Sequence, residues 1–118
     1  MSAPELIELR LERSRRVLVC EFAGGETFEL DCEYLRTHSP SAEVRGHGLS
    51  EPKLLTGKGD VNIDSIEPIG TYAVVLRFDD GHDTGIYSWD FLYDLGRNQK
   101  RYRSRYRERL ADAGLLEA

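Results

Sequence analysis

Strict alternation of apolar and charged residues over residues 6–12 is the feature that most constrains the fold of this chain. Ile7, Leu9 and Leu11 fall on one side of the segment, and glutamate and arginine occupy the positions between them. A period of two places every second side chain on the same face of a β-strand. The segment is therefore predicted to be a strand with one buried face.

Two further strands are predicted before the chain changes character. Residues 17–22 form an apolar run that suits a returning strand, and residues 27–30 supply a third. Gly24-Gly25 between them is a turn signal. The first third of the chain is thus predicted to be a three-stranded meander.

A short helix is expected directly after the third strand. Asp31 suits the N-cap position, and Tyr34 and Leu35 would then face the core. Ser39 precedes a proline, which disfavours helical backbone and should end the helix.

The longest irregular stretch of the chain, residues 43–60, follows this helix. Loops of that length inside compact domains are usually functional or mobile. The stretch carries Arg45 and His47, and it is the first place where we expect a binding surface.

More strands are predicted in the second half of the chain. Residues 61–69 and 71–78 suit two strands, of which the second should be central because both of its faces are apolar. Asp79-Asp80-Gly81 favours a hairpin, and residues 82–87 should return as the last strand. One face of the central strand would comprise Tyr72, Val74, Leu76 and Phe78.

Two helical stretches complete the chain. Ser88 is expected to cap the first, and Gly96 to bend or end it. The second is predicted over about residues 98–113. The buried stripe of the first would comprise Trp89, Leu92, Tyr93 and Leu95, and the packed face of the second Tyr102, Tyr106, Leu110 and Ala113, continuing from Leu95.

Together these elements predict an α+β fold: a small, antiparallel, strand-rich domain of about six strands, with a short helix after the third strand and a C-terminal helical segment. A length of 118 residues fits one domain. We divide it into a main part, residues 1–96, and a basic helical extension of the same domain, residues 97–118.

Charge is distributed unevenly between these two parts. Residues 1–96 hold 9 basic and 18 acidic residues, whereas residues 97–118 hold 7 basic and 3 acidic ones. The acidic balance of the whole argues against a dedicated nucleic-acid binder. The polar, acidic N-terminus lacks the pattern of a signal peptide, and no apolar run is long enough to span a membrane, so a cytoplasmic protein is expected.

Neither the cysteines nor the histidines form a recognisable site in sequence. Cys20 lies in an apolar run and Cys32 at a helix start, and both are interpreted as structural thiols rather than a disulfide framework. A zinc site would need four ligands, and Cys32, His38, His47 and His82 could converge only through the fold. We expect separate, hydrogen-bonding histidines and no bound cofactor, with zinc or iron as the alternative.

Two charged segments have competing interpretations. The aspartates around His82 could be acid–base groups, but aspartate is also ordinary turn chemistry, and a solvated turn is expected. The extension could contact an acidic protein or nucleic acid, or could simply be the solvated side of a packed helix. Its basic residues are Arg97, Lys100, Arg101, Arg103, Arg105, Arg107 and Arg109.

Several phrases taken together resemble one known family. They are Leu35-Arg36, Ser39-Pro40-Ser41-Ala42-Glu43, Gly70-Thr71-Tyr72-Ala73, Phe78-Asp79-Asp80-Gly81-His82 and Gly85-Ile86-Tyr87-Ser88-Trp89. The combination resembles the gamma-butyrobetaine hydroxylase-like N-terminal domain, over about residues 5–96. The resemblance implies a domain that stands alone in bacteria, precedes the catalytic domain of certain 2-oxoglutarate-dependent dioxygenases, or is fused to ATPases that carry iron–sulfur clusters.

In the dioxygenases the resemblance also implies a structural zinc held by three cysteines and one histidine. The cysteine positions correspond here to Ser39, Ser41 and Val44, and only His82 keeps a ligand type. Serine hydroxyls and valine do not replace thiolates, so the family's zinc site is expected to be broken in this chain.

The leading hypothesis is a non-catalytic accessory or protein-interaction domain that assists iron–sulfur or other metalloprotein assembly through a partner protein. A zinc- or iron-binding module, a weak nucleic-acid binder acting through the basic helix, and a small enzyme with an unrecognised constellation remain alternatives. The expected interaction surface comprises Arg36, Arg45, His47, Asp80, His82, Tyr87 and Trp89.

Overall fold

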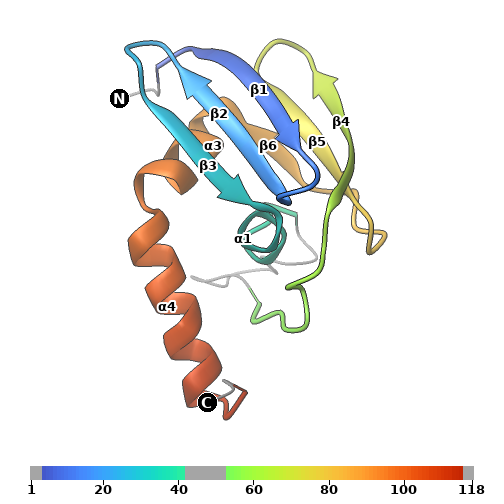
Figure 1. The fold of residues 1–118 in the computed structure, drawn as a ribbon, viewed down its shortest axis with the longest axis vertical. Helices are drawn as coiled ribbons and strands as arrows, with labels where there is room; N and C mark the ends of the chain where they lie inside the picture. The colour runs from blue at the N-terminus through green and yellow to red at the C-terminus, as the bar shows by residue number, and fades with distance from the viewer. Residues whose placement is uncertain (1–3, 42–52, 116–118) are drawn as a thin grey trace.

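A computed structural model describes residues 4–41 and 53–115 (Figure 1). Six strands in these ranges form two antiparallel sheets, ordered β1-β2-β3 and β4-β5-β6. The strands are β1 (Leu6–Glu12), β2 (Val17–Phe22), β3 (Thr27–Asp31), β4 (Ile63–Ile69), β5 (Ala73–Phe78) and β6 (Ile86–Ser88). The helices are α1 (Cys32–Thr37), α3 (Trp89–Arg97) and α4 (Gln99–Asp112). The predicted α+β class, the opening meander and the central position of β5 are confirmed.

The core lies between the two sheets and is closed by α1 and α3 (Figure 1). Each sheet turns its apolar row inward, as a period of two requires. Both of the predicted core residues of α1 are buried as well, with Tyr34 2% and Leu35 0% exposed. The central side chains are Leu18, Cys20, Phe22, Leu30, Ile63, Val74, Leu76, Phe78, Tyr87, Leu92 and Leu95.

Two apolar residues face solvent against the prediction. The register of β1 on β2 shifts between Leu6 and Glu8, so Leu6 packs against the core and Ile7 is 57% exposed. Tyr72 is 58% exposed because Ile69 pairs with Ala73 and the three residues between them form the turn. Both segments form strands as the period of two predicts. The bulge in β1 and the turn before β5 change which residues face the core.

The last strand is also shorter than predicted, since β6 begins at Ile86 rather than at residue 82. The turn itself is confirmed: Gly81 has a φ of 90°, and the backbone N–H of Phe78 donates to the carbonyl of His82. Residues 83–85 then leave the sheet. His82 and Thr84 contact the segment after α1.

Both helix caps are those predicted from sequence. The Asp31 carboxylate accepts from the Tyr34 N–H at 2.7 Å, and the Ser88 hydroxyl accepts from the Phe91 N–H at 3.1 Å. Gly96 lies one residue before the end of α3 at Arg97, close to the predicted end. A Cβ at this glycine would lie 2.3 Å from the Phe28 ring, so its lack of a side chain lets α3 pack on β3.

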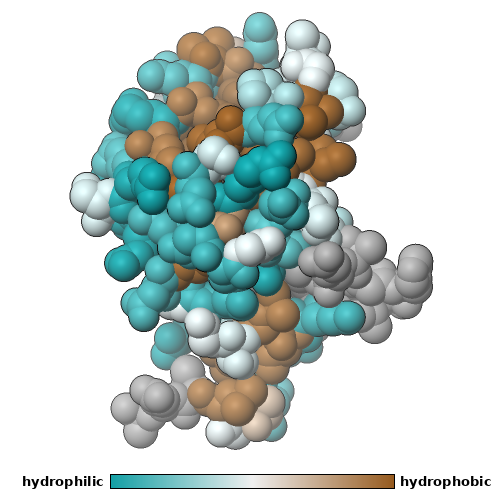
Figure 2. All heavy atoms as spheres, turned by 90° about the vertical axis from the view of Figure 1, so that its right-hand side faces the viewer, coloured by the Kyte–Doolittle hydropathy of each residue, from teal (hydrophilic) through white to brown (hydrophobic). Residues whose placement is uncertain are grey.

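The exposed side of β4 is polar. Asp64, Ser65 and Glu67 are exposed along this edge strand, and Pro68 removes one of its backbone donors. Figure 2 shows the corresponding face as largely hydrophilic, with apolar residues gathered toward its upper edge. An edge of this kind discourages pairing with another strand.

Candidate functional site: a buried hydroxyl–histidine cluster and the basic helix

Four polar side chains far apart in sequence meet behind α1. The Ser39 hydroxyl lies 2.9 Å from Nε2 of His82, and the Ser41 hydroxyl lies 2.7 Å from that of Thr84. Ser39 Oγ also accepts from the backbone N–H of Ser41 at 3.2 Å. Ser39 is 0% and His82 is 6% exposed. We call these four residues the hydroxyl–histidine cluster.

An ion-pair group lies beside this cluster, centred on Asp80. One carboxylate oxygen accepts from Nε of Arg36 and from Nζ of Lys58, both at 2.8 Å, and the other accepts from the His82 N–H at 3.1 Å. Burial by itself would raise the pKa of Asp80, but the hydrogen bonds from Lys58, His82 and Arg36 outweigh it and lower that pKa to about 2. Asp80 lies in an exposed turn, as expected, but its side chain is only 19% exposed and anchors the hairpin to α1 through these contacts.

The buried guanidinium of Arg36 depends on this pair. Its Nη1 atom has no hydrogen-bond partner and is shielded from solvent in the described chain. A buried cation is costly unless a counter-ion compensates it, and Asp80 is that counter-ion.

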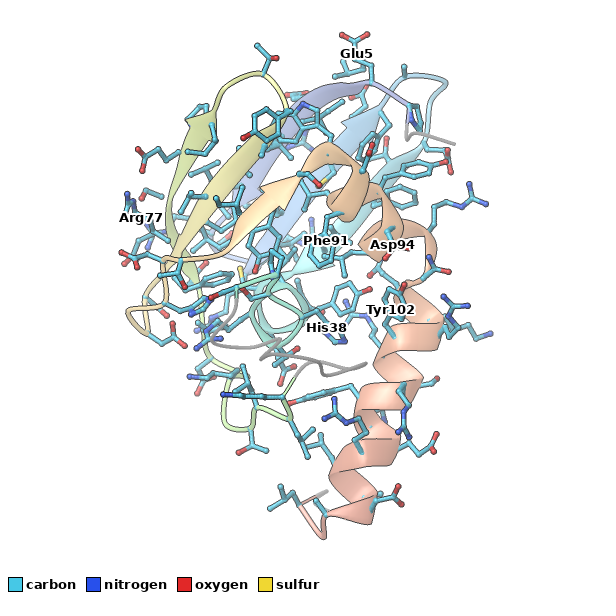
Figure 3. All side chains as sticks on the ribbon, turned by 180° about the vertical axis from the view of Figure 1, so that it is seen from behind. Glu5, His38, Arg77, Phe91, Asp94 and Tyr102 are labelled. Atoms are coloured by element: carbon cyan, nitrogen blue, oxygen red, sulfur yellow. The ribbon has the colours of Figure 1, made fainter. Side chains whose placement is uncertain are left out.

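The N-terminal half of α4 packs against α1 through aromatic side chains. The ring of His38 stacks on that of Tyr102 at 6.1 Å and an interplanar angle of 21°, and the guanidinium of Arg103 lies 4.5 Å from the ring centre of Tyr34. The Tyr106 hydroxyl donates to the Leu55 carbonyl. Figure 3 shows His38 and Tyr102 side by side between the two helices, with Asp94, which accepts from the Tyr102 hydroxyl at 2.8 Å, next to them.

The predicted packed face of α4 is thus largely correct. Tyr102, Tyr106 and Leu110 are half-buried, but Ala113 is exposed because α4 extends away from the rest of the domain (Figure 1). In the described part of the chain, no residue of α4 is fully buried.

The basic residues of the extension fall into two groups. Some are held by the domain itself: Arg103 pairs with Asp31 at 2.6 Å, and Arg97 lies 3.7 Å from Glu26. Others face outward, and Lys100 and Arg107 are exposed and have neither ion pair nor hydrogen bond with any described residue. Seven residues apart, these two lie on the same side of the helix, with Ser104 between them.

The expected interaction surface does not form one surface. Tyr87 is fully buried and its hydroxyl donates to the Leu35 carbonyl at 2.7 Å, so its inclusion was wrong. His82 and Arg36 are buried in the two groups described above. Trp89 is half-buried, with its indole N–H donating to the Thr71 carbonyl at 2.8 Å. Val44, Arg45 and His47 lie outside the described residues.

The cysteines are inert in their surroundings. Both are free and buried, and burial raises the pKa of Cys20 to about 12 and that of Cys32 to about 11. His38 donates through Nδ1 to the Tyr34 carbonyl at 3.0 Å, as expected of a hydrogen-bonding histidine. Within residues 4–41 and 53–115, no three His, Cys, Asp or Glu side chains come together to hold a metal ion.

Sequence reasoning missed the pairing partners in both buried groups. No local sequence pattern indicated the pairing of Lys58, of Thr84 or of Ser39 with His82. Both serine contacts join residues that are 43 positions apart. The only available indication was that the phrases around residues 39–41 and 78–82 belong to one family pattern.

Comparison with known proteins identifies that family. Residues 9–93 match the family described as "Gamma-butyrobetaine hydroxylase-like, N-terminal". This chain belongs to the gamma-butyrobetaine hydroxylase-like N-terminal domain family. The basic helix α4 lies outside the matched residues. No curated protein matches the chain.

Three solved structures resemble it closely. Two are described only as NMR solution structures. One is 50% identical to this chain with a TM-score of 0.83, and the match covers 98% of this chain and 86% of the other. The second is 39% identical with a TM-score of 0.82, and the match covers 98% of this chain and 94% of the other. The third is a crystal structure of a protein of unknown function in the DUF971 family from Acidithiobacillus ferrooxidans, 36% identical with a TM-score of 0.68, covering 80% of this chain and 98% of its own. Stand-alone domains of this kind therefore occur. The match to the third structure leaves one fifth of this chain uncovered.

The family's zinc does not fit the residues present here. Tetrahedral zinc holds its ligand atoms about 3.5 Å apart, since each lies about 2.0–2.3 Å from the metal. Ser39 Oγ and His82 Nε2 instead contact each other directly at 2.9 Å. The hydroxyls of Ser39 and Ser41 are neutral oxygen donors where zinc prefers thiolate.

Among the described helices, none combines the length and the apolar character of a membrane-spanning segment.

Proposed function

We propose that this domain is a non-catalytic accessory module that binds a partner protein through the outward side of α4. The observation that carries the proposal is the pair Lys100 and Arg107, exposed on a helix that contributes no fully buried residue to the domain. A helix of 14 residues that adds so little to the core is better explained by what it presents to solvent.

The contacts of the polar groups support a non-catalytic role. His82, Asp80 and Arg36 are each engaged in contacts that hold segments of the domain together. General acid–base catalysis needs a group with a pKa near the working pH inside a cleft. The pKa of Asp80 is lowered to about 2, and those of both thiols are raised far above neutrality. Among the described residues, the hollow between α1 and α4 has a volume of about 20 Å³, which is room for a single water.

An acidic protein suits the outward side of α4 better than a nucleic acid does. Binding to a nucleic acid usually rests on several phosphate contacts. In the described part of α4, Lys100, Arg101 and Arg107 are exposed and make no ion pair, beside a main part with 18 acidic residues. The main part would repel a long polyanion, whereas a local acidic patch on a protein could meet α4 alone. The family's fusion to ATPases with iron–sulfur clusters leads us to place this partner in iron–sulfur or other metalloprotein assembly.

Charge reversal on α4 tests the proposal. The chain is used as bait under native conditions in three forms: wild type, Lys100→Glu with Arg107→Glu, and Arg13→Glu as a control at an exposed position in the turn between β1 and β2. We expect the wild type and the control to recover the same partner, and the double variant to lose it while its circular dichroism stays unchanged. Equal recovery by all three forms, or no specific partner, would contradict the proposal.

The nucleic-acid alternative has its own measurement. A fluorescent single-stranded RNA is titrated with wild type at low and at physiological salt. No binding at low salt removes this alternative, whereas binding that weakens steeply with salt and is abolished by Lys100→Glu with Arg107→Glu would favour it over a protein partner.

A further inference from the structure

We infer that the hydroxyl–histidine cluster is a metal-free clasp, which holds the segment after α1 against the connection between β5 and β6. The inference is independent of the partner proposed for α4.

The two contacts of the clasp have the same spacing along both segments. Residues 39 and 41 meet residues 82 and 84, so both segments advance by two residues between one contact and the next. In extended backbone such a spacing puts both side chains of a segment on the same side. The contacts therefore act as two adjacent ties between segments that share no sheet pairing.

Three of the four clasp residues are buried and Thr84 is exposed, so the contact of Ser39 with His82 matters most for stability. Ser39 is 0% and Ser41 6% exposed. A buried hydroxyl or imidazole that loses its partner keeps its desolvation cost, about 1–3 kcal/mol. Gly85 shows how close the packing is, since a Cβ there would lie 2.5 Å from Ser39 Oγ.

The same geometry explains why the residues present do not suit a metal. Ser39 and His82 are in direct contact, and a cation between them would have to separate them while accepting two neutral hydroxyls as ligands.

The first experiment measures metal and stability in the wild type. Untagged protein purified without chelator is expected to hold less than about one metal ion per ten chains and to keep its Tm in excess EDTA, because the fold does not depend on a metal. Near-stoichiometric zinc or iron that is lost in His82→Ala would overturn the inference.

The second experiment tests the clasp itself. Ser39→Ala with Ser41→Ala should lower the Tm by about 5–10 °C, the shift expected for losing one buried and one partly buried hydrogen bond in a domain of this size. If this variant does not fold, Thr84→Ala tests one tie alone and should lower the Tm by less, while Thr84→Ser restores the hydroxyl and the stability. Variants as stable as wild type would show that the clasp has no structural role.

Discussion

Replacing Gly96 with alanine should destabilise the domain, although helix propensity alone predicts the opposite. Gly96 lies within α3, where alanine is favoured over glycine by about 0.5–1 kcal/mol. Its added Cβ, however, would lie 2.3, 2.5 and 2.8 Å from three atoms of the Phe28 ring. Contacts below about 3 Å require the ring or the helix to move, and overpacking of this kind costs about 1–3 kcal/mol.

The Phe28 ring has little freedom to withdraw. It packs against Phe22 at 5.9 Å and against Tyr93 at 5.8 Å between ring centres, and Tyr93 belongs to the same helix as Gly96. We therefore place the overpacking cost near the upper end of its range. After subtraction of the propensity gain, Gly96→Ala should lower the free energy of unfolding by about 2 kcal/mol.

Urea unfolding followed by far-UV circular dichroism measures this change. Ser104→Ala, at an exposed position in α4, is the propensity control and should raise stability by a few tenths of a kcal/mol, about the difference between serine and alanine in helices. Gly96→Ala in a Phe28→Leu background should cost less than in the wild type, because a smaller side chain relieves the contact. A Gly96→Ala variant as stable as wild type, or more stable, would refute the packing argument.

Three further predictions follow from local contacts. Asp80→Asn should lower the free energy of unfolding by about 1–2 kcal/mol at neutral pH. Because the pKa of Asp80 is lowered in the folded state from 3.8 to about 2, this loss of stability relative to wild type should be full above pH 4 and should disappear toward pH 2. A loss of stability that does not change with pH would contradict this. Cys20 and Cys32, whose pKa values burial raises, should resist thiol labelling at pH 8 until the protein is unfolded in urea; rapid labelling of native protein would show that they are accessible. Ser88→Ala should lower the free energy of unfolding by about 1 kcal/mol through loss of the α3 N-cap, whereas Ser88→Asp should retain it, and equal losses in both would exclude capping as the cause.

The candidate sites show how far sequence reasoning reaches. The phrase that contains Asp80 and His82 was recognised as important, but Tyr87 was placed on a surface although its side chain fills the core. Period and propensity describe which way a side chain points from its own strand. They do not tell whether that side faces solvent or another element, and an amphipathic side chain such as tyrosine suits either.

The sequence by itself determined the local elements of this protein. Alternation located the strands, and Asp31 and Ser88 fixed the starts of α1 and α3, because backbone conformation and capping depend on residues only a few positions apart. Tertiary structure alone decided that Gly96 must accommodate Phe28 and that Ser39 meets His82. Those contacts join residues 68 and 43 positions apart in the printed numbering, and the packing of two sheets and two helices, rather than any local pattern, brings them together.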